Sequence, residues 1–147
     1  MRVPTVGESL VIDRPRSEVF AFATDPANVP VYSSNLVEFE KTSEGPVGKG
    51  TTYRGVAKVA GRSLAWTSEV AEFEEGRHWV NRSVESPMAW EIDVAYEDAA
   101  GGTRITWRQD TANFGGFFGK LADPLVTRMY AKDVRSNLEK LKELLEA

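Results

Sequence analysis

The end of the chain decides the fold, because the period of its apolar residues changes there. Residues 103–147 read TRITWRQDTANFGGFFGKLADPLVTRMYAKDVRSNLEKLKELLEA. Over residues 103–111, apolar and polar side chains alternate, as in a half-buried strand. Beyond them, apolar residues recur at helical spacing with Lys and Glu between them, which predicts a long amphipathic helix. We expect this helix to begin near Phe117 to Lys120, with Pro124 either kinking it or marking its true first turn.

The chain before this segment carries the signals of short strands joined by turns. Period-two alternation and β-branched or aromatic residues predict strands over residues 6–12, 36–40, 51–59, 64–73, 79–84 and 88–96. Between the first two strands, two short helices are predicted over residues 15–23 and 28–32. Strands this close, joined by short turns, pair antiparallel. We therefore predict an α+β fold in which a curved, seven-stranded antiparallel sheet wraps around the long C-terminal helix.

Composition excludes several classes of function. The 147 residues suit one domain spanning 1–147, without internal repeats or linkers. The net charge of −4, with both signs mixed along the chain, argues against a nucleic-acid partner. Apolar runs are far shorter than the ~20 residues that span a bilayer, so no stable membrane insertion is expected. The N-terminus does not resemble a signal peptide, and we expect a cytoplasmic protein.

Neither a metal nor a cofactor is expected. The chain has no cysteine, which removes disulfides, thiolate metal sites and cysteine nucleophiles. His78 is the only histidine, and a lone histidine cannot build a His-based metal site. Its place at the start of a strand favours a surface position. No G-x-S-x-G motif or phosphate-binding glycine loop is present.

Five short segments resemble a known family in their order and spacing. They are residues 12–15 (IDRP), 25–32 (DPANVPVY), 48–51 (GKGT), 102–106 (GTRIT) and 138–142 (LEKLK). The chain resembles the SRPBCC superfamily, the START-like and birch-pollen-allergen-like helix-grip proteins, and within it the polyketide cyclase/dehydrase and lipid-transport branch. The resemblance implies a helix-grip fold with a cavity for a small hydrophobic ligand. The family usually has Trp where this chain has Tyr32, and no catalytic motif carries over.

Alternation along each strand predicts which side chains face that cavity. Charged Arg54 and Lys58 prefer water, for example, so the residues that alternate with them face inward, namely Tyr53, Gly55, Ala57 and Val59. Small inward residues leave room for a ligand, whereas the four tryptophans either frame the space or fill it. Residues 114–119 (FGGFFG) are either a lid or a helix entry that covers the cavity end. The predicted ligand-binding residues are Tyr53, Gly55, Ala57, Trp66, Ser68, Trp79, Asn81, Trp90, Ile92, Val94, Trp107, Gln109, Phe117, Leu121, Leu125 and Met129.

Three residues are candidates for acid–base chemistry, namely Glu8, Tyr32 and Tyr53. Glu8 shares a face of its strand with apolar residues, and a carboxylate inside an apolar cavity has a raised pKa and can act as an acid or base. The alternative is that Glu8 lies near the sheet end, hydrated or paired with an arginine.

Three functions remain open. The leading hypothesis is a carrier or sensor that binds a small lipid-, isoprenoid- or polyketide-like molecule, as a monomer or weak homodimer. The first alternative is a polyketide cyclase or dehydratase that uses polar residues of the cavity. The second is a protein-interaction module whose cavity is filled by side chains. An open cavity would favour the first two.

Overall fold

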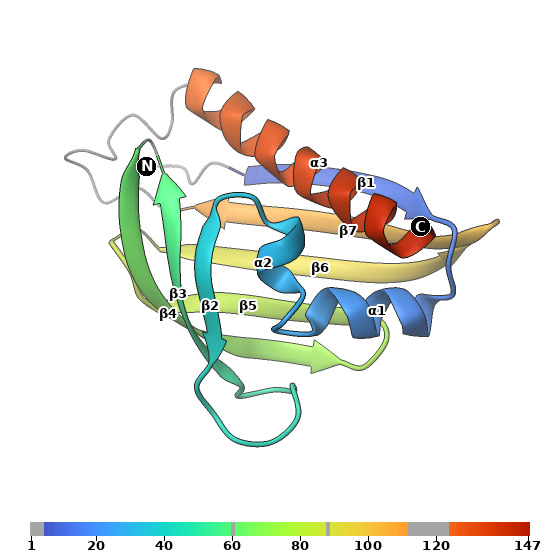
Figure 1. The fold of residues 1–147 in the computed structure, drawn as a ribbon, viewed down its shortest axis with the longest axis horizontal. Coiled ribbons are helices and arrows are strands. Elements are labelled where there is room, and N and C mark those ends of the chain that lie inside the picture. Colours follow the sequence, from blue (N-terminus) through green and yellow to red (C-terminus); the bar gives the residue numbers. More distant parts are fainter. Residues whose placement is uncertain (1–4, 60, 88, 112–123) are drawn as a thin grey trace.

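The computed structural model describes residues 5–59, 61–87, 89–111 and 124–147. Seven strands and three helices follow one another in this part of the chain (Figure 1). In chain order they are β1 (Thr5–Ile12), α1 (Arg16–Thr24), α2 (Val29–Tyr32), β2 (Leu36–Lys41), β3 (Thr52–Val59), β4 (Arg62–Glu74), β5 (His78–Glu85), β6 (Trp90–Ala99), β7 (Gly102–Thr111) and α3 (Pro124–Glu146). The predicted α+β fold and its order of elements are confirmed.

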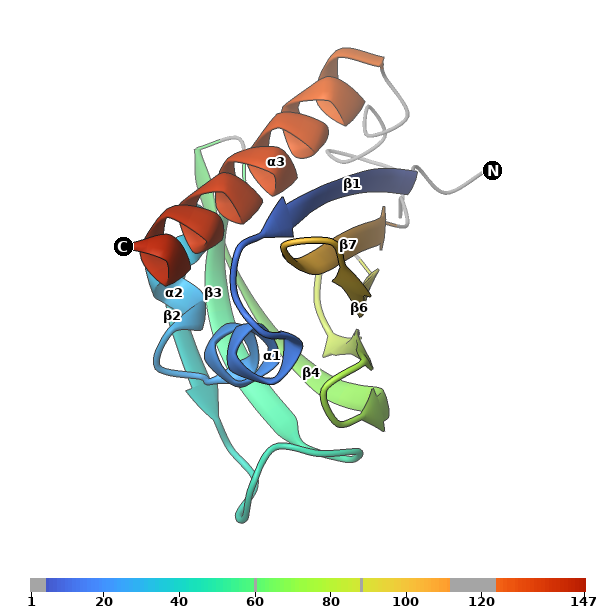
Figure 2. The ribbon, with the colours of Figure 1, turned by 90° about the vertical axis from the view of Figure 1, so that its right-hand side faces the viewer.

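The strands form one antiparallel sheet in the order β1-β7-β6-β5-β4-β3-β2. β2 to β7 are a meander, in which each strand pairs with the next along the chain. β1 pairs with β7, with Leu10 opposite Ile105. Figure 2 shows the sheet curving around the side on which α1, α2 and α3 lie. The concave side is therefore the side that the helices cover.

Two irregularities bend β4, the longest strand. Its register with β5 shifts between Thr67 and Ser68 and again between Val70 and Glu72. Such bulges increase the local twist and bend of a strand, so they contribute to the curvature of this part of the sheet. The hairpin from β3 to β4 turns at Gly61, whose φ of 78° lies in the left-handed region that favours glycine.

The C-terminal helix is fixed to the sheet by apolar packing and by hydrogen bonds at its end. Val134, Leu138 and Leu141 of α3 are buried in the core. The Lys142 ammonium group donates to the carbonyl oxygen of Val11, with Nζ 2.8 Å from the oxygen. None of the described helices is long and apolar enough to cross a membrane.

Some predictions lie outside the described residues. These are the helix start near residues 117–120, the lid over residues 114–119, and the ligand-binding roles of Phe117 and Leu121. Leu125 and Met129 lie in α3, but the description does not extend to their side chains.

Candidate functional site

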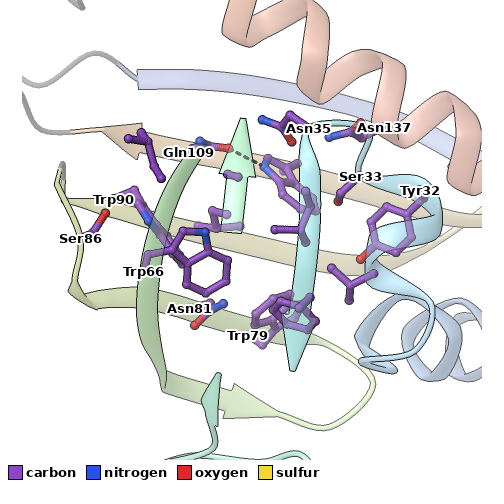
Figure 3. Close-up of a pocket in the computed structure, with 17 residues that line it drawn as sticks. Tyr32, Ser33, Asn35, Trp66, Trp79, Asn81, Ser86, Trp90, Gln109 and Asn137 are labelled. Carbon is purple, nitrogen blue, oxygen red and sulfur yellow. Dashed lines mark hydrogen bonds between the residues drawn. The ribbon is translucent and has the colours of Figure 1, made fainter. Parts of the chain in front are cut away.

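A cavity of about 140 Å³ lies between the concave face of the sheet and the helices (Figure 3). The sheet supplies most of its wall, and α2 and the segment after it supply one side. Among the residues of α3 whose side chains are described, Asn137 contributes to the wall. The cavity is lined by Val29, Tyr32, Ser33, Asn35, Leu36, Phe39, Ala57, Leu64, Trp66, Trp79, Asn81, Ser86, Trp90, Ile92, Trp107, Gln109 and Asn137.

Aromatic rings make up much of the wall, and all four tryptophans contribute to it. The rings of Trp66 and Trp90 meet edge to face, with centroids 5.0 Å apart and planes at 87°. Phe39 packs against Trp66 at 6.0 Å. Trp79 and Trp107 are each buried except for 7% of their surface. The tryptophans thus pack against their neighbours and still leave a space, so they frame the cavity and do not fill it.

Eight of the sixteen predicted ligand-binding residues line the cavity, and four others are described but lie outside its lining. Tyr53, Ser68 and Val94 are buried in the sheet wall without reaching the cavity. Those that line it are Ala57, Trp66, Trp79, Asn81, Trp90, Ile92, Trp107 and Gln109.

The prediction that Gly55 leaves room for a ligand is wrong. The indole of Trp66, which pairs with Gly55 across β3 and β4, occupies the room. A Cβ atom at Gly55 would lie 2.3 Å from Trp66 Cζ2, far closer than carbon atoms approach one another. The missing side chain therefore accommodates a tryptophan of the wall and adds no space to the cavity.

Several polar groups near the cavity already have partners. The Tyr32 hydroxyl donates to the carbonyl oxygen of Ala23 at 2.6 Å, which ties α2 to α1. The indole N–H of Trp79 donates to the Tyr96 hydroxyl oxygen at 3.2 Å.

Two side-chain amides around the cavity also accept hydrogen bonds. The Trp107 indole N–H donates to Gln109 Oε1 at 3.4 Å, the contact dashed in Figure 3. From α3, Asn137 Oδ1 accepts from the backbone N–H of Ser34 at 3.1 Å.

Two buried polar atoms of the inner face differ from these. Asn81 Oδ1 and Ser68 Oγ have no hydrogen-bond partner among the described residues. Asn81 is 4% exposed and lines the cavity, whereas Ser68 is 1% exposed and lies behind the lining. Among the described lining residues, Asn81 therefore has a fully buried side-chain acceptor without a hydrogen-bond partner.

Of the three acid–base candidates, Tyr32 lines the cavity and Glu8 and Tyr53 do not. Glu8 does not line the cavity; its Oε1 pairs with Arg135 of α3 at 3.1 Å. The prediction of a cavity carboxylate is therefore wrong, and the alternative of pairing with an arginine is confirmed, because β1 runs beside α3. Burial, with smaller effects of the Tyr96 and Tyr53 phenols, raises the pKa of Tyr32 well above its usual value. Burial also raises the pKa of Tyr53 to about 12.

His78 lies away from the cavity, at the start of β5. It is half-buried, and its Nε2 is 2.7 Å from Asp93 Oδ1. Within the described residues, no group of three or more His, Cys, Asp or Glu side chains could hold a metal ion.

Sequence reasoning missed part of the lining. Phe39 alternates with Glu38 and Glu40, so the period-two pattern could have found it. Asn137 precedes the buried Leu138 in α3, and its polar side chain gave no signal that it faces the core. The other missed residues come from α2, from the segment after it and from strand ends: Val29, Ser33, Asn35, Leu36, Leu64 and Ser86.

The sequence profile described as "Polyketide cyclase / dehydrase and lipid transport" matches residues 4–146. The chain belongs to this family. Because the match covers nearly the whole chain, the resemblance seen in its short motifs is confirmed. No curated protein sequence matches this member of the polyketide cyclase/dehydrase and lipid transport family.

Solved structures share the fold of this family member. The protein TTHA0849 from Thermus thermophilus is 24% identical, with a TM-score of 0.82 and 95% of each chain covered. The Zhui aromatase/cyclase from Streptomyces sp. R1128 is 15% identical, with a TM-score of 0.81 over 99% of this chain and 94% of that one. A START superfamily protein from Mycobacterium smegmatis is 11% identical, with a TM-score of 0.77 and 97% of each chain covered. These similarities establish the helix-grip fold.

Proposed function

We propose that the protein binds a small, uncharged hydrophobic molecule in the cavity between the sheet and α3, as a carrier or sensor. The observation that carries this proposal is the lining. Its aromatic and aliphatic side chains are accompanied by a few amides and hydroxyls, and none of the 17 lining residues is charged. Ligand sites of proteins have this composition, mostly apolar with a small number of placed polar groups.

The volume limits the size of the ligand. At about 140 Å³, the cavity is close to an engineered apolar cavity of about 150 Å³ that binds benzene. It is smaller than the ~300–1,000 Å³ of sites that hold drug-sized ligands. A single ring, or one prenyl-sized or ring-sized part of a lipid-, isoprenoid- or polyketide-like molecule, suits this space.

The chemistry of the lining supports binding over catalysis. Tyr32 is the one titratable residue among the 17 lining residues. Its hydroxyl already donates to Ala23, and its raised pKa keeps it protonated at neutral pH. General acid–base catalysis works best when the pKa lies near the operating pH. A cyclase or dehydratase mechanism therefore has less support in these residues than a carrier or sensor role has. The open space also argues against an interaction module with a filled cavity.

Native mass spectrometry tests the proposal with a matched variant. Ala57 lines the cavity from β3, so Ala57→Phe adds a ring to the lining. Both proteins would be incubated with a small-molecule extract of the native host, repurified, and analysed under native and denaturing conditions. We expect an extra mass on the wild type that is absent from the folded variant. A mass retained equally by both proteins, or by neither, would count against binding in this cavity.

A further inference from the structure

We infer that Asn81 determines which ligand the cavity accepts, by taking a hydrogen bond from a hydroxyl or N–H group of the ligand. This inference rests on the proposed binding function and narrows the ligand to an uncharged apolar molecule with a hydrogen-bond donor. Its basis is that Asn81 lines the cavity while its buried Oδ1 has no partner among the described residues.

The position of Asn81 explains why its side chain finds no partner in the sheet. Asn81 lies in β5, in the middle of the sheet, and it pairs with Val70 of β4 and Ile92 of β6. Both neighbours are apolar, so neither side chain donates a hydrogen bond. Figure 3 shows Asn81 beside Trp79 on the cavity wall. No donor among the described residues is bonded to its amide oxygen, so a molecule inside the cavity can supply one.

Two donors of the cavity wall already bond to other groups. The Trp79 indole N–H is directed to the Tyr96 oxygen, and the Tyr32 hydroxyl to Ala23. The other buried cavity amide, Asn137, uses its Oδ1 to accept from Ser34. Asn81 thus differs from Asn137 in one respect that matters for binding, because its acceptor has no partner among the described residues.

The uncharged lining favours a neutral ligand that can donate a hydrogen bond to Asn81. A carboxylate ligand would enter a space without a cationic side chain among its lining residues, and burying an unpaired charge is strongly unfavourable. A neutral hydroxyl bonded to Asn81 satisfies both groups, since buried polar atoms are almost always hydrogen-bonded. The terminal torsion of asparagine is broad, so the amide can turn its oxygen toward such a group.

The test compares two ligands of nearly equal shape, p-cresol and 4-fluorotoluene, of which p-cresol alone can donate a hydrogen bond. All four tryptophans line the cavity, so their indole N–H signals in ¹H–¹⁵N NMR spectra report binding. The measured quantity is the ratio of the two dissociation constants in the wild type and in Asn81→Leu. Ser68→Ala is the matched control, because Ser68 Oγ is also buried and unpaired among the described residues but lies behind the lining.

We expect the preference for p-cresol over 4-fluorotoluene to fall about five- to tenfold in Asn81→Leu, the size of one hydrogen bond between neutral groups. In Ser68→Ala, the preference should stay within about twofold of the wild type. Asn81→Ala repeats the comparison if the leucine variant does not fold.

Two results would overturn the inference, and they differ in what else they affect. If both ligands bind and their ratio is unchanged in Asn81→Leu, the cavity binds ligands but Asn81 does not select them. If neither ligand moves the indole signals of the wild type, the proposed binding function fails as well.

Discussion

The contact between Gly55 and Trp66 predicts that Gly55→Ala destabilises the protein. The added Cβ would lie 2.3 Å from Cζ2 and 2.7 Å from both Cε2 and Cη2 of the indole. Carbon atoms pack favourably at about 3.5–4.0 Å, so the ring would have to move by more than about 1 Å. Trp90 and Phe39 pack against the same ring, at 5.0 and 6.0 Å between centroids, and oppose that movement.

Overfilled cores typically lose about 1–3 kcal/mol, and we expect Gly55→Ala to lower the free energy of unfolding by about 2 kcal/mol. In a chain of this length, the loss corresponds to a fall in melting temperature of roughly 4–8 °C. The assay is urea unfolding followed by circular dichroism, with thermal unfolding as a second readout. Gly7→Ala is the matched control, because Gly7 also lies in a strand and a Cβ there meets nothing within 4 Å.

A double-mutant cycle identifies the cause of the loss. In the background of Trp66→Leu, the indole is absent, so Gly55→Ala should cost less than about 0.5 kcal/mol, near the limit at which independent sites add. The reasoning is refuted if Gly55→Ala is neutral in the wild type, or if its cost is the same in both backgrounds.

Three further predictions concern single side chains. Tyr32→Phe removes the donor to the buried Ala23 carbonyl, so the free energy of unfolding should fall by about 1 kcal/mol in urea titrations; an unchanged midpoint would contradict this role. Burial raises the pKa of Tyr53 from 10.0 to about 12, so the stabilising contribution of this residue is full below about pH 10 and is lost toward pH 12. Tyr53→Phe should therefore flatten the alkaline fall in melting temperature, and an identical fall in both proteins would contradict this contribution. The hydrogen bond from the Asp13 backbone N–H lowers the pKa of Glu146 from 4.5, so the contribution of Glu146 to stability is present above about pH 4.5 and is lost as the pH falls further. The melting temperature of Glu146→Gln should therefore fall less steeply in acid than that of the wild type, and equal slopes would contradict this contribution.

The strands and their inner faces were predictable, because they depend on local alternation. Trp66, Trp90 and Trp107 face inward as the period-two pattern predicts, and charged Arg54 is exposed. The pairing of β1 with β7 was not predictable in this way. It joins residues about a hundred positions apart, and no local pattern in either strand specifies the partner.

The errors at the site have a common physical cause. The alternation of polar and apolar residues predicts the face of the sheet on which a side chain lies, but it does not predict which neighbouring side chain packs against it. The indole of Trp66 in the next strand occupies the space beside Gly55, and the Glu8 carboxylate pairs with Arg135 of α3. Asn137 was missed because the pattern of apolar residues in a helix does not indicate an inward polar side chain, whereas Asn137 bonds to Ser34.

The central claim is that the space among the four tryptophans receives a small, uncharged apolar molecule. Crystals of the protein soaked in 4-bromophenol test it directly, since the anomalous signal of bromine locates the ligand without reference to the protein coordinates. We predict a bromine peak among Trp66, Trp79, Trp90 and Trp107, with the hydroxyl group directed at Asn81. Bromine found only on the outer surface, with these side chains closed over the space, would contradict the claim.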